Sequence, residues 1–288
     1  MHLKGVSQMA ALVLHFRNGT TLVQRMRAGE PCDKVVLWDG TRISHPPGRE
    51  GLMEALTEVW LEHVYTAGFY RPADKDVIVD AGANVGIFAI QMARQNPRCR
   101  VIALEPFPEN FRYLEANVAR CCPENVICRE VALGGRFGKG QMLAEGSRSL
   151  DHVLRVEEAE TKGAALAGAA TDVSSIAGTS IDGATTDGVE VIPLAGLFEL
   201  ARIYLSASGE IDFLKVDIEG SERDVFAAAS PDVLGRFKRI ALEYHDQIVP
   251  GTLDLLRRVL NPTHEVTVRP SKMEGCGILL AQRRGLKN

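Results

Sequence analysis

The stretch KDVIVDAGANVGIFAIQMA, residues Lys75–Ala93, decides the fold of this chain. Four apolar residues surround one carboxylate, Asp80, and two glycines, Gly82 and Gly86, precede a second apolar run. A short apolar run that ends at glycine is typical of a buried strand, and the run after the glycines has the composition of a helix. A glycine-rich turn at such a junction lets a ligand approach the backbone closely. The stretch therefore predicts a strand, a turn and a helix, with a ligand lying across the turn.

Strand-like and helix-like segments alternate along the rest of the chain. This alternation predicts an α/β fold with a doubly wound, largely parallel sheet. No helical segment separates the last two strands, so we expect them to pair antiparallel. The further strands are predicted at residues 100–106, 125–133, 211–220, 236–245, 264–270 and 275–284.

The first 73 residues have a different pattern. Asn18-Gly19 and Asp39-Gly40 each lie between apolar-rich runs. Asn-Gly and Asp-Gly tolerate the positive φ angles of a type I′ turn, so each pair predicts a hairpin. Residues 51–67 change to helical spacing. We therefore expect a small N-terminal β-meander and a helix at residues 1–73, followed by the main domain at residues 74–288.

Residues 157–188 interrupt the alternation. They are rich in alanine, glycine, threonine and serine and contain few large apolar side chains. Such a composition buries too little apolar surface to offset the entropy lost on ordering. We expect a flexible insertion here, and a mobile lid over the ligand site is the functional alternative.

Composition excludes several classes of protein. With 45% hydrophobic residues, 24% charged residues and a net charge of −4, the chain has an ordinary soluble composition and no electrostatic case for binding nucleic acid. No apolar run approaches the roughly 20 residues that span a bilayer. The N-terminus lacks the pattern of a signal peptide, so we expect a cytoplasmic protein with no membrane partner. The six cysteines form no C-x-x-C pair and are expected to be reduced packing residues.

The glycine turn distinguishes two classes of nucleoside ligand. A nicotinamide dinucleotide requires G-x-G-x-x-G, whereas this chain has G-A-N-V-G-I from Gly82, with Asn84 at the position of the second glycine. Asp80 beside the turn would repel a pyrophosphate, and it suits the cationic ammonium and sulfonium of S-adenosylmethionine. Gly82, Asn84 and Gly86, together with Asp80, therefore predict an S-adenosylmethionine site. A nucleoside-dependent oxidoreductase is the disfavoured alternative.

Two further elements belong to the predicted cofactor site. Glu105 ends the second predicted strand, where a carboxylate can accept both ribose hydroxyls of a nucleoside. This role is common to NAD and S-adenosylmethionine, so it supports a nucleoside without choosing between the two. Pro106 follows directly and is placed in the same site. Tyr65 precedes the domain and is expected to flank the cofactor, with packing against the helix as the alternative.

Five segments carry a resemblance to a known family. They are VDAGANVGIFAI (79–90), VIALEPFPENFRYLEANV (101–118), VALGG (131–135), IDFLKVDIEGSERDVF (211–226) and IALEYH (240–245). Together they resemble the FkbM family of class I S-adenosylmethionine-dependent methyltransferases, over about residues 65–282. The most specific motif is K-x-D-x-E-G-x-E, here Lys215–Glu222.

The resemblance implies a Rossmann-like, seven-stranded methyltransferase sheet. It also implies O-methylation of a hydroxyl on a small natural product or a sugar-containing metabolite. One position departs from the family pattern: T-L-D often precedes the motif, and Gly196 lies where that aspartate would fall.

Strand ends supply the candidate catalytic groups, because ligands of doubly wound sheets lie beyond the carboxyl ends of the strands. Asp217 and Glu219 follow one strand, and His245 and Asp246 follow the next. Transfer of a methyl group to a hydroxyl requires a held acceptor oxygen and a group that accepts its proton. We expect Asp217 and His245 to be catalytic, although a structural role is the alternative for His245.

Glu219 and Glu222 are predicted to bind substrate. For Glu222, which begins a helix, interaction with the helix dipole is the alternative. Lys215 shares a strand face with Asp217 and is expected to neutralise it or to take part in the site.

Several alternatives stay open on the sequence. Asp217 with Glu219, Glu243 or Asp246 could hold Mg²⁺ through oxygen ligands, which the sequence allows but does not favour, so no metal is assigned. Nitrogen or carboxyl acceptors, or a non-catalytic S-adenosylmethionine-binding module, use the same turn. The expected partner is a small-molecule substrate, and a homodimer is a possible assembly.

Overall fold

The computed structural model of the chain describes residues 2–144, 152–156, 186–271 and 273–286. The insertion predicted at residues 157–188 lies outside these residues except for its last three. Within the described part of the chain, no helix is both long and apolar enough to cross a membrane.

A seven-stranded sheet forms the centre of the molecule, in the order β12-β13-β11-β10-β3-β4-β5. The neighbours from β11 to β5 are parallel, and β13 is antiparallel to both β11 and β12. The predicted doubly wound sheet and its closing antiparallel pair are thus confirmed. The strands are β3 (Val77–Ala81), β4 (Arg100–Leu104), β5 (Val126–Arg129), β10 (Ile211–Val216), β11 (Phe237–His245), β12 (His264–Pro270) and β13 (Cys276–Arg283).

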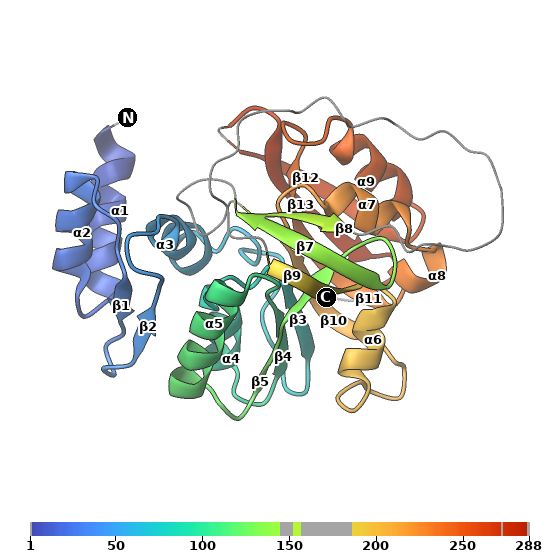
Figure 1. The fold of residues 1–288 in the computed structure, drawn as a ribbon, viewed down its shortest axis with the longest axis horizontal. Coiled ribbons are helices and arrows are strands. Elements are labelled where there is room, and N and C mark those ends of the chain that lie inside the picture. Colours follow the sequence, from blue (N-terminus) through green and yellow to red (C-terminus); the bar gives the residue numbers. More distant parts are fainter. Residues whose placement is uncertain (1, 145–151, 157–185, 272, 287–288) are drawn as a thin grey trace.

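Helices cover both faces of this sheet (Figure 1), which explains why its central strands are nearly continuous apolar runs. Ile78 of β3 belongs to a buried cluster on one face, whereas Val77 and Val79 belong to a cluster on the other. The first face packs against α4 (Ile87–Gln95) and α5 (Pro108–Cys121). The second face packs against α6 (Gly196–Ala201), α7 (Glu222–Ala227), α8 (Pro231–Leu234) and α9 (Thr252–Leu260).

The strand order reverses between β3 and β10, and this reversal positions the site. The chain proceeds from β3 to β4 and β5 on one side, and β10 and β11 lie on the other. Asp217 follows β10 and its amide donates a hydrogen bond to the carbonyl of Ala81, 3.1 Å away. Gly82 follows β3 and donates to the carbonyl of Leu104 at the end of β4, 3.0 Å away. Three strand ends therefore meet at one edge, where ligands of such sheets bind.

A second, four-stranded sheet was not expected from the sequence. It has the order β6-β9-β7-β8, with β6 (Val131–Leu133), β7 (Gly138–Ala144), β8 (His152–Val156) and β9 (Thr186–Ile192). The strand predicted at residues 125–133 is divided at Glu130, because β5 pairs with β4 and β6 pairs with β9. Figure 1 shows β7 and β8 crossing over the main sheet.

The hairpin predicted at Asn18-Gly19 is wrong, and so is the N-terminal β-meander. This segment forms two helices, α1 (His2–His15) and α2 (Gly19–Ala28). Leu12 and Phe16 are both buried, whereas Leu14 between them is exposed; a strand would place all three on one face, so this pattern is that of a helix. A Cβ atom on Gly19 would lie 2.2 Å from the carbonyl oxygen of Leu12, so the glycine allows the two helices to approach.

The second predicted hairpin is confirmed. β1 (Lys34–Val36) and β2 (Arg42–Ser44) pair antiparallel around Asp39-Gly40, and Gly40 has φ of 88°. The helix predicted at residues 51–67 is also present as α3 (Leu52–Ala55), which continues into the π-helical segment η1 (Leu56–Leu61).

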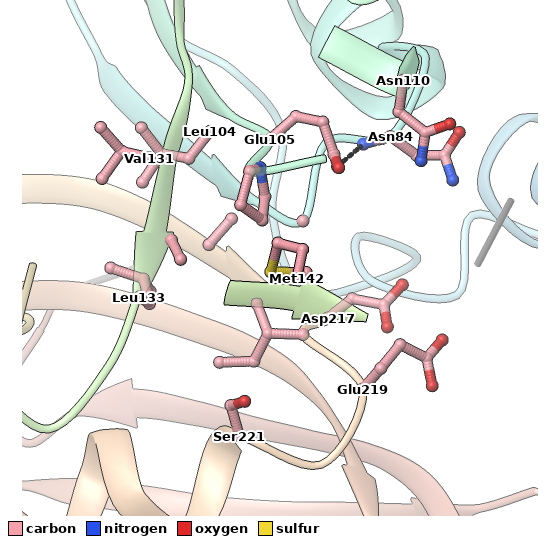
Figure 2. Close-up of a pocket in the computed structure, with 15 residues that line it drawn as sticks. Asn84, Leu104, Glu105, Asn110, Val131, Leu133, Met142, Asp217, Glu219 and Ser221 are labelled. Atoms are coloured by element: carbon pink, nitrogen blue, oxygen red, sulfur yellow. Dashed lines mark hydrogen bonds between the residues drawn. The ribbon is translucent and has the colours of Figure 1, made fainter. Parts of the chain in front are cut away.

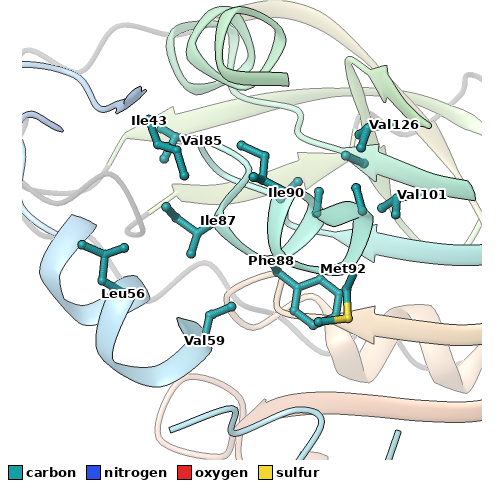
Figure 3. Packing of buried hydrophobic residues seen from close by; sticks show 14 of the residues in the cluster. Ile43, Leu56, Val59, Val85, Ile87, Phe88, Ile90, Met92, Val101 and Val126 are labelled. Atoms are coloured by element: carbon teal, nitrogen blue, oxygen red, sulfur yellow. The ribbon is translucent and has the colours of Figure 1, made fainter. Parts of the chain in front are cut away.

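The N-terminal elements share a hydrophobic core with the main sheet. Figure 3 shows Leu56 and Val59 directed toward Ile87 and Phe88 of α4, and all four belong to one buried cluster. The core is therefore continuous across the domain boundary at residue 74, and that boundary stays a prediction.

We predict that Gly82→Ala destabilises the protein far more than Gly48→Ala. Both glycines have φ near +75°, but a Cβ atom on Gly82 would lie 1.7 Å from the carbonyl oxygen of Asp217, whereas Gly48 has open space. The control should lose about 1 kcal/mol of unfolding free energy from backbone strain alone. The Gly82 variant should lose at least about 2 kcal/mol more. Urea unfolding measures both variants, and equal losses would contradict the close approach of β3 and β10.

Candidate functional site

Two adjoining hollows lie at the carboxyl edge of the sheet, where the strand order reverses. Gly82, Asn84, Asp217 and Glu219 line both of them. We call them the first hollow and the acidic hollow. The first hollow is also lined by Leu104, Glu105, Pro106, Asn110, Leu133 and Met142. The acidic hollow is also lined by Glu58, Tyr65, Phe88, Lys215, Glu243 and His245.

The glycine turn has a backbone conformation, with positive φ angles, that few residue types adopt. Gly82, Asn84 and Gly86 have φ angles of 76°, 50° and 92°. Asparagine tolerates this left-handed region better than most residues with a side chain, which explains its place between the glycines. Gly86 lines neither hollow: a Cβ atom there would lie 2.8 Å from Leu114 of α5. Of the three predicted turn residues, Gly82 and Asn84 reach the ligand site, and Gly86 allows close helix packing.

Glu105 ties the turn to the end of β4. One of its carboxylate oxygens accepts the amide N–H of Asn84 at 2.8 Å, and the other accepts the amide N–H of Phe107 at 2.9 Å. Burial raises the pKa of Glu105 to about 7, although these two hydrogen bonds act in the opposite direction. Each oxygen keeps a further lone pair, so the carboxyl group can still accept a hydrogen bond from a hydroxyl of a bound ligand.

The first hollow has a polar side and an apolar side. Figure 2 shows Asn84, Asn110, Asp217 and Glu219 together on one side, with Leu104, Val131 and Leu133 on the other. Met142 of β7 lies between them. The apolar wall thus comes partly from the second sheet, which the sequence did not predict. A flat, mostly apolar group fits such a slot.

Lys215 and Asp80 form an ion pair behind the site. The Lys215 ammonium lies 3.2 Å from Asp80, donates to the Gly82 carbonyl at 2.8 Å, and lies 3.6 Å from Asp217. Burial raises the pKa of Asp80 and opposes charge on Lys215, but Asp80 and Asp217 raise the pKa of Lys215 above its ordinary value. Asp80 is fully buried and lines neither hollow. The structure therefore places Asp80 against Lys215 and outside both hollows, and its predicted contact with the cofactor stays a prediction.

Tyr65 joins two carboxyl groups of the acidic hollow. Its hydroxyl lies 3.1 Å from Asp217 and 3.2 Å from Glu243. A phenol has one proton to donate, so one of these two contacts needs a proton from a carboxyl group. Burial, and then the charge of Asp217, raises the pKa of Glu243 to about 7, which favours that proton. Tyr65 was predicted to flank the cofactor, and the structure places it in the acidic hollow.

His245 is held between two glutamates. Its Nδ1 lies 3.0 Å from Glu222 and its Nε2 lies 3.5 Å from Glu219. Burial alone would lower the pKa of His245, but the hydrogen bond and charge of Glu222, with the charge of Glu219, raise it to about 10. Glu222 is fully buried and lines neither hollow, so its predicted contact with substrate is not what the structure shows. Glu219 lines both hollows with φ of 49°, a strained conformation.

Glu58 is a site residue that the sequence did not reveal. It lies on η1, and π-helical turns are frequent at functional sites. Burial, followed by the charges of Glu243 and Asp217, raises the pKa of Glu58 to about 7. Only the folding of η1 against the sheet brings this carboxyl beside residues more than 150 positions away, so no local sequence signal could have found it.

Among the residues that the structure describes, one group of donors could hold a metal ion. Single donor atoms of Asp217, Glu243 and His245 all lie within 4.8 Å of one another. Asp246, which the sequence added to this group, instead accepts the amide N–H of Leu253. Lys215 already supplies positive charge 3.6 Å from Asp217. The assignment of no metal stays a prediction.

Comparisons with known proteins agree on one family. The family model described as "Methyltransferase FkbM domain" matches residues 80–262. The chain is 28% identical to AMB antimetabolite synthetase AmbE of Pseudomonas aeruginosa over 70% of its length, but it spans only 10% of that relative. It is 27% identical to 31-O-demethyl-FK506 methyltransferase FkbM of Streptomyces tacrolimicus, covering 75% of this chain and 82% of that one.

A solved structure is also similar. Precorrin-6y C5,15-methyltransferase from Geobacter metallireducens GS-15 matches 84% of this chain and 94% of its own, with a TM-score of 0.42 and 15% identity.

We predict that the ligand-free protein loses stability as the pH rises from 5 to 8. Glu58, Glu105 and Glu243 have pKa values of about 7, and Glu219 of about 8, against an ordinary value of 4.5. A group whose pKa is raised by folding binds more protons in the folded state, so its stabilising effect is lost as pH rises through the folded pKa. Urea unfolding at pH 5, 6.5 and 8 measures the trend, and Glu58→Gln should make it shallower. Stability that increased over this range would contradict the placement of these carboxyls.

Proposed function

This chain belongs to the FkbM methyltransferase domain family, and from that premise we propose that it transfers a methyl group from S-adenosylmethionine to a hydroxyl of a small natural product or sugar-containing metabolite. The observation that carries the proposal is the meeting of two hollows at Gly82, Asn84, Asp217 and Glu219. One hollow suits a nucleoside and the other is rich in carboxyl groups.

The residues of the first hollow fit S-adenosylmethionine. Glu105 offers carboxylate oxygens to ribose hydroxyls, and the wall with Leu133 and Met142 suits a flat base. Gly82 lines this hollow without a side chain, so a ligand can approach its backbone closely. When bound, the cofactor supplies a methyl group already activated by its positively charged sulfur. The turn lacks the second and third glycines that a dinucleotide requires, which disfavours NAD.

Asp217 is the group we assign to accept the proton of the hydroxyl. It lines both hollows, so it lies where cofactor and acceptor would meet. His245 was the other predicted base, but its raised pKa of about 10 keeps it protonated near neutral pH, and a protonated imidazole cannot accept a proton. We assign to His245 a positioning role: it holds Glu219 at the edge between the hollows.

Oxygen is the acceptor atom we favour. The relative from Streptomyces tacrolimicus is named as a 31-O-demethyl-FK506 methyltransferase, and the acidic hollow contains groups able to remove a hydroxyl proton. A hydroxyl is a weak acid and benefits from such a base more than an amine or a carboxylate does.

Calorimetric titration tests the cofactor. We expect binding of S-adenosylmethionine and S-adenosylhomocysteine and no binding of NADH, and the reverse result would end the proposal. Transfer of a labelled methyl group to a panel of hydroxyl compounds then tests the acceptor. A methyl ether survives mild base, whereas a methyl ester is cleaved, so the product separates oxygen from carboxyl acceptors. Methylated amines would show that nitrogen is the acceptor.

We predict that Glu105→Gln weakens the binding of S-adenosylhomocysteine about ten-fold, because ribose hydroxyls lose a charged acceptor. Glu124→Gln, an exposed glutamate of the same domain, is the matched control and should leave affinity unchanged. Calorimetry measures both variants. Unchanged affinity in a folded Glu105 variant would show that another residue binds the ribose.

We also predict that Asp217→Asn lowers turnover by about 10²–10⁴ while leaving affinity for S-adenosylhomocysteine within about two-fold, because the amide cannot accept the proton. Turnover with a labelled methyl group and calorimetry provide the two measurements. Normal turnover would assign the proton to another group. Activity that EDTA abolishes would show that a bound metal carries the step.

A further inference from the structure

The acidic hollow has more carboxyl groups than positive charges available to them. Glu58, Asp217, Glu219 and Glu243 all line it. Its two cationic side chains already form ion pairs with carboxylates that lie outside the hollow. Lys215 lies 3.2 Å from the fully buried Asp80, and His245 lies 3.0 Å from the fully buried Glu222. Neither Asp80 nor Glu222 lines the hollow, so each cation is shared between a carboxylate outside it and one inside it: Lys215 also lies 3.6 Å from Asp217, and His245 lies 3.5 Å from Glu219.

The surroundings of the hollow strengthen this imbalance. Buried apolar side chains such as Leu52, Val59 and Phe88 form part of its wall, so water screens the carboxyl groups weakly. The pKa values of Glu58 and Glu243 are raised by burial and by neighbouring carboxylates. A hollow of this kind holds either protons or a cationic ligand.

We propose that Glu58 and Glu243 make the cofactor site selective for positive charge, so that the protein binds S-adenosylmethionine more tightly than S-adenosylhomocysteine. The proposal rests on the proposed function, because it concerns the same cofactor. The two ligands differ by one methyl group and by the charge on sulfur, so any large difference in affinity reports the electrostatics of the site.

We assign the charge selection to Glu58 and Glu243 because they line the acidic hollow and not the first hollow. Asp217 and Glu219 also line the first hollow, and Asp217 is assigned the proton of the acceptor, so variants there would not report the charge of the acidic hollow alone. Glu58 comes from η1, ahead of the region that the family model matches, so the N-terminal elements would contribute to cofactor selection. The charged and titratable groups that face this pair or line the hollow beside it include Glu54, Glu62, Tyr65, Lys215, Asp217, Glu219, His245 and Cys276.

Charge selection would assist turnover. During transfer the bond between sulfur and the methyl carbon breaks, and its electron pair stays on sulfur. The carbon bonds to the acceptor oxygen, and the hydroxyl proton passes to the carboxylate of Asp217. The hollow thereby loses a cationic ligand and gains a proton. Its attraction for the neutral product falls, which favours release of S-adenosylhomocysteine.

Calorimetry with three probes tests the proposal without any acceptor. S-Adenosylmethionine, S-adenosylhomocysteine and sinefungin, which has an amine near the position of the sulfonium, are titrated at pH 8 in low salt with EDTA. We expect S-adenosylmethionine to bind about ten-fold more tightly than S-adenosylhomocysteine, with sinefungin resembling the former. Glu58→Gln and Glu243→Gln should each weaken the two cationic probes several-fold and leave S-adenosylhomocysteine within two-fold. Glu124→Gln, an exposed glutamate that lines neither hollow, is the matched control.

Two further readouts separate electrostatics from a structural role. Because the pKa values of Glu58 and Glu243 are about 7, both are largely protonated at pH 5.5, and the preference for the cationic probes should shrink there. At pH 7 the cationic probes should release protons on binding, measured in buffers of different ionisation enthalpy, whereas S-adenosylhomocysteine should release fewer. A variant that only perturbs structure would weaken all three probes alike.

The outcomes are distinct. Equal affinities for the two cofactor forms in the wild type, or equal weakening of all probes in both variants, would overturn the proposal. Failure of every probe to bind would overturn the proposed function itself. If EDTA removed a preference that Mg²⁺ restored, a bound metal, and not these carboxylates, would be the source of selectivity.

Discussion

The rest of the site depends on the ion pairs and the hydrogen bond that the Lys215 ammonium makes. The ammonium lies between Asp80 of β3 and Asp217 beyond β10, and it bonds the carbonyl of Gly82. It therefore joins the two strands at the point where the strand order reverses. A buried carboxylate without such a partner would be costly, and a buried ammonium equally so. The position of the glycine turn, and thus of both hollows, follows from this pairing.

A second consequence concerns the balance of charge. Lys215 and His245 are each shared between a carboxylate buried behind the wall and one that lines the hollows, so Glu58 and Glu243 have little positive charge left to them. A positively charged sulfonium in the hollow would be attracted by this excess of carboxylate charge. The N-terminal elements complete the arrangement, because η1 adds Glu58 and the following turn adds Tyr65. The family domain and the residues before it thus build one electrostatic environment.

Much of the fold and part of the site could be predicted from the sequence, because the signals are local. Apolar runs of strand length and helical spacing indicate the strands of the main sheet and the helices between them. Glycines with positive φ indicate the turn at Gly82, and polar residues at strand ends indicate Glu105 and Asp217. Asp39-Gly40 forms the expected hairpin for the same reason. In each case one short stretch contains the physical cause.

Tertiary structure decided what depends on distant partners. The turn at Asn18-Gly19 joins two helices because the apolar face of α1 is buried against the core, and burial outweighs the preference of the dipeptide for a hairpin. Asp80 and Glu222 lie against buried cations and line neither hollow, a direction that sequence position does not reveal. By itself, the sequence determined the succession of strands along the chain in the main sheet and the chemistry of the turn. Which carboxyl groups face the ligand was decided only by folding, because pairing between side chains requires their elements to meet.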